Sequence, residues 1–180
     1  MFVVPDWDGQ LRLSDTPPGP PSSARDLEVR SVPYRTARAF VERHHYLGYA
    51  PPGVRVCLGV WYGERLVGVL VFGRPSARLE DQRRTLELTR MVLLDECSRN
   101  SESRALALAV RWIWKNMPGI RRLIAYADPG REHRGTVYRA AGWRLVGRTN
   151  GGRWSCPSRP RRRDAAVGPK LKFELILGTP

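Results

Sequence analysis

Carboxylate and phenol side chains at two positions of the sequence could carry out proton transfer. Asp128 follows the apolar segment 122–127 and precedes Pro129. A carboxylate at the end of a buried strand can act as a general base or as a metal ligand, although aspartate before proline is also common in turns. Tyr138 follows in a short helical segment, where its hydroxyl could donate a proton or its ring could simply fill the core.

Two histidines and a tyrosine are consecutive near the end of the segment 33–47, at His44, His45 and Tyr46. Neighbouring residues on a helix point about 100° apart, so at most two of these three side chains can share a site. Arg90 lies in an apolar segment, where a buried guanidinium needs a partner. That partner could be Asp128 or an anionic substrate, and a plain structural salt bridge is the alternative.

The helices and strands predicted from the sequence must position these residues. Apolar spacing, together with Gly or Pro at the ends, predicts helices at 33–47, 104–115 and 136–141. Strands are predicted at 54–62, 66–72, 85–94, 122–127, 143–148 and 170–177. Prolines exclude a helix or central strand from 14–23. We therefore expect an arm at 1–24 and a single domain at 25–180.

The predicted element order resembles that of the GNAT acyltransferases. The stretch Tyr138-Arg-Ala-Ala-Gly142-Trp143 resembles the step from the last helix to the next strand in that family, where Gly ends the helix and an aromatic begins the strand. The resemblance implies an α/β (α+β) fold in which helices flank a central mixed, mostly antiparallel sheet.

One loop departs from the GNAT pattern. GNAT enzymes bind the pyrophosphate of coenzyme A with a glycine-rich loop at a helix N-terminus, but residues 97–103 contain no glycine, and Glu102 would repel an anion. We therefore expect no conventional acetyl-CoA binding. Ser101 and Ser103 could still donate hydroxyl groups to an anion there, or they could merely cap the following helix.

The chain is strongly basic, with a formal net charge of +14, which favours a polyanionic partner. The segment 145–163 contains no acid, and the predicted basic loop spans 145–169. Its candidate DNA-binding residues are Arg148, Arg153, Trp154, Arg159, Arg161, Arg162 and Arg163, of which Trp154 could stack on a base. The alternative for this loop is a solvated basic segment without a partner. The alternative for the overall charge is a genome that favours Arg codons.

Several fragments together resemble the Mom family of bacteriophage DNA-modification proteins. They are His45-Tyr46, Arg90 within Leu-Thr-Arg-Met, Asn100-Ser-Glu-Ser103, Asp128-Pro129 and the string Arg-Gly-Thr-Val-Tyr-Arg-Ala-Ala-Gly-Trp that contains Tyr138. The tail is a looser match, because Leu171 and Phe173 stand where the pattern often has His and Tyr. The resemblance covers about residues 33–175.

The resemblance implies a GNAT-like enzyme that converts adenine in DNA to an N6-carbamoylmethyl derivative and so protects phage DNA from restriction. It implies a catalytic set of Tyr46, Asp128, Tyr138, Arg90 and Ser103. It also implies a transition metal, iron above all, held by His45, Tyr46 and Asp128. The donor of the transferred group stays open. The oligomeric state stays open as well, with a homodimer as one possibility. Since adenine N6 is buried in the duplex, such an enzyme must extrude the base or use single strands.

Two other functions stay open. The chain could be an ordinary N-acyltransferase that uses acyl-CoA, or a non-catalytic nucleic-acid-binding protein of a transposon or defence system, since the strings HHYLG and GTVYRAAGW resemble such proteins as well. No apolar run reaches the roughly 18 residues of a membrane helix. Three cysteines without a CxxC pair, and no signal peptide, predict reduced thiols in the cytoplasm, that of the host if a phage encodes the protein.

Overall fold

The computed structural model describes residues 2–5, 11–14, 23–131, 133–151 and 168–178. The central sheet has seven strands in the order β3-β4-β5-β6-β7-β9-β8, and only the β6–β7 pair is parallel. These strands are β3 (Leu27–Ser31), β4 (Val54–Tyr62), β5 (Arg65–Gly73), β6 (Thr85–Leu93), β7 (Arg122–Ala127), β8 (Arg144–Arg148) and β9 (Leu171–Ile176). The mixed, mostly antiparallel sheet predicted from the sequence is confirmed.

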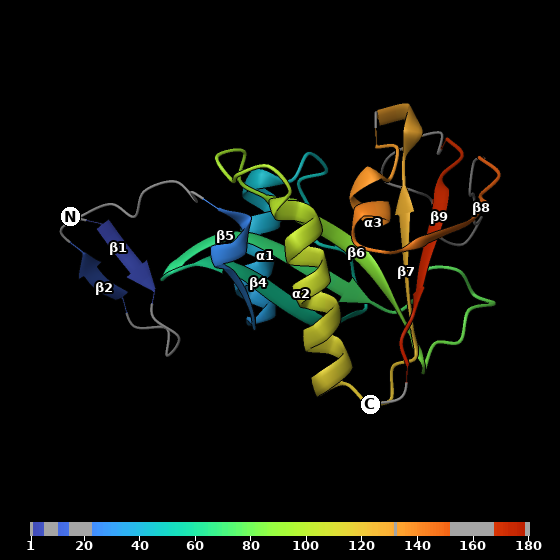
Figure 1. Ribbon diagram of the computed structural model, residues 1–180, viewed down its shortest axis with the longest axis horizontal. Helices are drawn as coiled ribbons and strands as arrows, with labels where there is room; N and C mark the ends of the chain where they lie inside the picture. The colour runs from blue at the N-terminus through green and yellow to red at the C-terminus, as the bar shows by residue number, and fades with distance from the viewer. Residues whose placement is uncertain (1, 6–10, 15–22, 132, 152–167, 179–180) are drawn as a thin grey trace, which may run out of the picture.

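Helices cover both faces of this sheet, as Figure 1 shows. They are α1 (Tyr34–His44), α2 (Ser101–Asn116) and α3 (Thr136–Ala140), with short 3-10 helices η1 (Ala24–Asp26) and η2 (Pro129–Arg131). A separate two-stranded antiparallel sheet is formed by β1 (Phe2–Pro5) and β2 (Leu11–Ser14). None of the described helices is both long and apolar enough to cross a membrane.

Side chains alternate between the two faces of the central strands and pack into two separate cores. On β5, Val69 and Val71 pack with Ala37 and Val41 of α1. Leu70, the residue between these two valines, points to the other face and belongs to the larger core under α2 and α3. Since successive residues of a strand point to opposite faces, α1 and α2 lie on opposite sides of the sheet.

Two predicted boundaries were wrong by three residues, and both bear on the site; the others agree to within one residue. The first helix ends at His44, because His45 has extended backbone and Gly48 turns the chain with a φ of 61°. His45 and Tyr46 therefore follow the helix, and the 100° spacing does not apply to them. The second helix begins at Ser101, three residues before its predicted start at 104.

Strand β3 was not predicted at all. Among the described strands it pairs only with β4, at the edge of the sheet, and Leu27 is its one buried residue. Its solvent-accessible side chains Glu28 and Arg30 form an ion pair with each other. Such a short and half-polar segment carries little of the apolar alternation that identifies a strand in the sequence.

Candidate active site

The site is a cavity of about 570 Å³ at the place where β6 and β7 separate. The two parallel strands pair only from Thr85 to Leu88 on β6 and from Arg122 to Ala125 on β7. Beyond the last pair, the residues that follow on both strands line the cavity: Thr89, Arg90 and Met91 on β6, and Tyr126, Ala127 and Asp128 on and after β7. The divergence of two neighbouring strands thus creates the cavity.

A bulge in β6 places Arg90 in this cavity. Val71 of β5 pairs with Arg90, whereas the next residue, Phe72, pairs with Leu88, so Thr89 is the extra residue. The Thr89 hydroxyl donates to the main-chain carbonyl of Val71 at 2.9 Å, which fixes the bulge. A bulge of this kind bends the strand and redirects the side chains that follow it.

The guanidinium of Arg90 is held by main-chain carbonyl groups. Its Nε donates to the carbonyl of Tyr49 at 3.2 Å, and its Nη1 donates to the carbonyl of Thr89 at 2.6 Å. The guanidinium carbon also lies 4.6 Å from the centre of the Tyr49 ring. Arg90 thus links β6 to the segment that follows α1.

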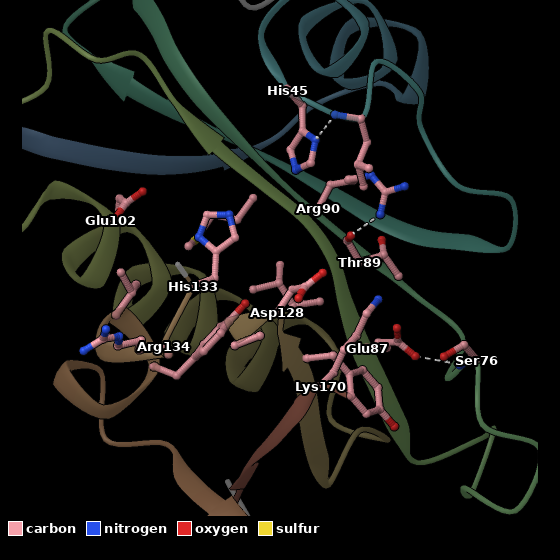
Figure 2. A pocket seen from close by; sticks show the side chains of 18 of the residues that line it. His45, Ser76, Glu87, Thr89, Arg90, Glu102, Asp128, His133, Arg134 and Lys170 are labelled. Carbon is pink, nitrogen blue, oxygen red and sulfur yellow. Dashed lines mark hydrogen bonds between the residues drawn. The ribbon is translucent and has the colours of Figure 1, made fainter. Parts of the chain in front are cut away.

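That segment carries His45 and Tyr46 to the cavity wall. The main-chain N–H of Leu47 donates to Nδ1 of His45 at 3.1 Å. The His45 ring stacks on the Tyr46 ring with 4.4 Å between the ring centres, and the Tyr46 ring is 5.8 Å from that of His133. Figure 2 shows His45, which follows α1, around the same opening as Asp128 and His133, which both follow β7.

Electrostatics keep His45 neutral at physiological pH. Burial is the main cause, and the nearby Arg90 cation and His133 add to it, so that the pKa of His45 falls to about 4. Because Nδ1 accepts a hydrogen bond from a main-chain N–H, the neutral ring must carry its proton on Nε2. His45 is therefore arranged as a hydrogen-bond donor.

Asp128 forms a turn and also lines the cavity. It directly follows β7 and lines the cavity. One carboxylate oxygen, Oδ1, accepts the main-chain N–H of Gly130 at 3.0 Å, which stabilises the turn into η2. The turn-forming role of an aspartate before proline is thus real, and it fixes the carboxylate at the cavity.

Tyr138 comes from α3, whose position depends on Gly135. Gly135 has a φ of 74°, and a Cβ atom there would lie 2.3 Å from the Phe173 ring, so only glycine fits. The Tyr138 ring packs 5.1 Å from that of Phe173 and 5.6 Å from that of Trp143. Burial, then Glu102 and Tyr46, raises the pKa of Tyr138 to about 12. Its phenol is therefore protonated at neutral pH.

The cavity also contains polar residues to which the sequence analysis gave no catalytic role. Glu87 is buried on β6, and its Oε2 accepts the main-chain N–H of Ser76 at 2.6 Å. Others that line the cavity are Glu102, His133, Arg134 and Lys170. The sequence did carry a signal for Glu87, which is the one acid in the apolar segment 85–93. A buried carboxylate needs a partner or a function.

Two groups of predicted residues lie elsewhere. Ser103 does not line this cavity but a neighbouring groove, and its hydroxyl donates to the main-chain carbonyl of Asn100 at 3.0 Å, as a residue in the first turn of a helix can. Arg148 is exposed at the end of β8. The other candidates of the basic loop lie outside the described residues: Arg153, Trp154, Arg159, Arg161, Arg162 and Arg163.

The expected iron ligands do not fit a metal ion in this arrangement. A ligating histidine offers the lone pair of one nitrogen and donates from the other, whereas His45 accepts at Nδ1 and carries its proton on Nε2. Within the described part of the chain, no group of three His, Cys, Asp or Glu side chains could hold an ion. Iron remains a prediction that rests on the family resemblance.

Comparison with solved structures shows the fold. The chain resembles the ribosomal-protein-S5-alanine acetyltransferase of Vibrio fischeri with a TM-score of 0.58 and 14% identity, over 84% of this chain and 93% of that one. It resembles a GNAT-family acetyltransferase of Bacillus anthracis with a TM-score of 0.58 and 16% identity, over 86% and 96% of the two chains. The predicted GNAT-like fold is therefore confirmed.

Comparison with known sequences shows the family. The chain is similar to the methylcarbamoylase Mom of Escherichia phage Mu, with 32% identity over 132 residues, which are 69% of this chain and 55% of that protein. The chain thus spans about half the length of this relative. The sequence pattern of the Mom protein family matches residues 26–154. Since that match includes most of the chain, and all the cavity residues up to Thr149, the chain belongs to the Mom protein family, as its motifs predicted.

Proposed function

We propose that this protein modifies adenine in DNA by attaching a carbamoylmethyl group to N6, and that the modification protects phage DNA from restriction in the host cytoplasm. The proposal rests on membership of the Mom family. The observation that supports it most directly is the meeting of Tyr46, Arg90, Asp128 and Tyr138 in one cavity. These residues come from three distant parts of the sequence.

The size of the cavity suits a single base. An enzyme that acts on adenine N6 must take the base out of the duplex or use a single strand. The cavity of about 570 Å³ is within the usual range for sites that enclose a small ligand. Exposed Tyr46 and Tyr49 lie on the segment after α1, where their rings could stack on an extruded base.

In the proposed reaction Asp128 accepts a proton and Tyr138 donates one. The exocyclic amine of adenine is a weak nucleophile, so bond formation at N6 needs a base that removes a proton. The Asp128 carboxylate is the base in this proposal. Tyr138 is protonated at neutral pH, since its pKa of about 12 lies far above 7, and in this proposal it donates a proton to the group that leaves the donor.

Arg90 and His45 act as hydrogen-bond donors in the same proposal. The Nε2–H of neutral His45 and the guanidinium of Arg90 can stabilise negative charge on the donor as its bond breaks. Such donors are effective because their partners hold them in place before the reaction. For Arg90 these partners are the carbonyl groups of Tyr49 and Thr89, and for His45 the partner is the N–H of Leu47.

The acyltransferase alternative keeps one supporting observation, which is the fold itself. Against it, Glu102 in the first turn of α2 lines the cavity with a carboxylate where a pyrophosphate would approach the helix. Asn100 before it already adopts a φ of 68°, a backbone conformation that favours glycine, yet it carries a side chain. These residues disfavour close approach of a phosphate to this loop from the cavity side.

Mass spectrometry of nucleosides from plasmid DNA would test the proposal. We expect cells that express the protein to contain a deoxyadenosine heavier by one carbamoylmethyl substituent. Asp128→Asn should abolish this product, because asparagine can still accept from the Gly130 N–H but cannot act as a base. Asp95→Asn, which changes an exposed acid outside the cavity, is the matched control and should modify DNA as the unaltered protein does.

The same experiment separates the alternatives. Unmodified DNA from well-expressed protein that binds coenzyme A would favour an acyltransferase. Unmodified DNA from protein that binds only DNA would favour a non-catalytic nucleic-acid-binding protein.

A further inference from the structure

A basic groove lies beside the cavity, on the other side of the first turn of α2. Its volume is about 840 Å³. Glu102 lines the cavity, whereas its neighbour Ser103 lines the groove. The same division occurs on α3, where Tyr138 lines the cavity and Ala140 lines the groove. The first turn of α2 and the short helix α3 thus form a shared wall.

The groove contains three arginines and no acid among its described lining residues. Arg25 comes from η1, Arg99 from the loop before α2, and Arg104 from the first turn of α2. Arg122, by contrast, is paired with Glu80 and Glu174. No ion pair within the described part of the chain involves the three groove arginines.

One of the groove arginines, Arg104, also has a donor atom without an acceptor in the described part of the chain. Its Nε atom is buried and has no hydrogen-bond partner within the described residues. A buried donor without a partner costs about 1–3 kcal/mol, and charged donors cost more. Such groups in folded proteins call for a specific reason, and a bound anion is one.

The cavity and the groove differ in charge. The described lining of the cavity carries as many acids as cations, with Glu87, Glu102 and Asp128 beside Arg90, Arg134 and Lys170, whereas the described lining of the groove carries cations alone. The groove beyond the shared wall offers guanidinium groups, which bind phosphate with paired hydrogen bonds. A nucleotide whose base enters the cavity would therefore have its backbone directed along the groove.

We propose that this groove binds the phosphodiester backbone of DNA next to the nucleotide whose base enters the cavity. The inference rests on the proposed function, since it takes DNA as the substrate. It adds a phosphate-binding surface of Arg25, Arg99 and Arg104, distinct from the basic loop at 145–169. Contacts of this kind set the register of a protein on DNA without reading its sequence.

Salt-dependent DNA binding by the full chain tests this surface. The double substitution Arg25→Gln with Arg99→Gln removes two groove charges and leaves the partly buried Arg104 in place. Its control, Arg35→Gln with Arg43→Gln, removes the same charge from the exposed surface of α1, which lies on the opposite face of the sheet. Fluorescence anisotropy of a labelled DNA duplex would give the affinity of each protein over a series of salt concentrations.

We expect the groove substitutions to lower the slope of log affinity against log salt by about 2, roughly one for each lost phosphate contact. The α1 control should leave the slope nearly unchanged. Equal slopes in the two double variants would overturn the inference, because only net charge would then matter. Coenzyme A binding that disappears in the groove variant would also overturn it, by assigning the groove to a nucleotide cofactor.

The inference and the proposed function can fail separately. If the slopes differ as expected but deoxyadenosine stays unmodified, the groove stands and the proposed function fails. If deoxyadenosine is modified but the groove variant keeps the unaltered slope, the groove alone is wrong.

Discussion

The guanidinium of Arg90 lies over the ring of Tyr49, 4.6 Å from its centre, and donates to the main-chain carbonyl of the same residue. This one relationship joins the bulge of β6 to the segment that carries His45 and Tyr46. The two walls of the cavity are therefore coupled through Arg90.

Arg90→Lys should damage activity although it keeps the charge. An ammonium group cannot make both carbonyl hydrogen bonds while stacking on the Tyr49 ring. We expect about 10–100-fold slower DNA modification, because displaced cavity residues lose their alignment. The loss of unfolding free energy should stay near 1 kcal/mol, since the side chain is partly exposed. Rates and urea unfolding of the same preparation check both values, and an unaltered rate would contradict the coupling.

Gly135→Ala should destabilise the fold more than Gly142→Ala. Both glycines have positive φ, 74° and 82°, so either alanine costs about 1–2 kcal/mol of backbone strain. At Gly142 no atom lies within 4 Å of the added methyl group, whereas at Gly135 that group would meet the Phe173 ring at 2.3 Å. We expect a further loss of about 1–3 kcal/mol at Gly135. Urea unfolding of the two variants measures the difference, and equal losses would mean that α3 does not pack on Phe173 as described.

The fold was predictable because its central elements carry strong patterns. The residues of β4 and β7 were predicted with their observed bounds, since both segments are apolar and end at Gly, Pro or Asp. Strand β3 was missed because a short edge strand with Glu28 and Arg30 on its solvent side shows little apolar alternation. Its pairing with β4 is a long-range property that local sequence does not contain.

The members of the site were predictable in part, but their contacts were not. Motif resemblance identified Tyr46, Arg90, Asp128 and Tyr138, and all four line one cavity. The partners expected for Arg90 were a carboxylate or a substrate, yet the contacts found are main-chain carbonyls. Every residue has a carbonyl, so no residue type could indicate this. The protonated nitrogen of His45 likewise follows only from the position of the Leu47 N–H.

The pKa of His45 predicts how stability depends on pH. The folded value of about 4 lies below the ordinary value of 6.5, so the unfolded chain binds more protons between these values. Stability due to neutral His45 is therefore fully present above about pH 6.5 and is lost as pH falls toward 4. Since the ring is only half-buried, solvent screening should reduce the loss between pH 7 and pH 5 to about 1 kcal/mol.

His45→Asn is the matched variant for that measurement. The Asn oxygen can accept the Leu47 N–H as Nδ1 does, but it does not titrate in this range. Urea unfolding at pH 7 and pH 5 should show a smaller decrease in stability for the variant than for the unaltered protein. Parallel decreases would show that His45 titrates normally and that burial beside Arg90 has no effect on it.

Tyr138→Phe should separate catalysis from packing. The ring contacts with Phe173 and Trp143 stay in place, so the unfolding free energy should change by no more than about 1 kcal/mol. Loss of a general acid typically slows a reaction by about 10²–10⁴-fold, and we expect DNA modification to decrease by this amount. Tyr126→Phe removes a hydroxyl from the same cavity and is the control that should keep most of the activity.

Because the pKa of Tyr138 is about 12, its deprotonation cannot cause a loss of rate below about pH 11 in the unaltered protein. Quantified modified deoxyadenosine from matched expression levels tests the assignment, and a Tyr138→Phe protein as active as the control would leave Tyr138 with a packing role alone.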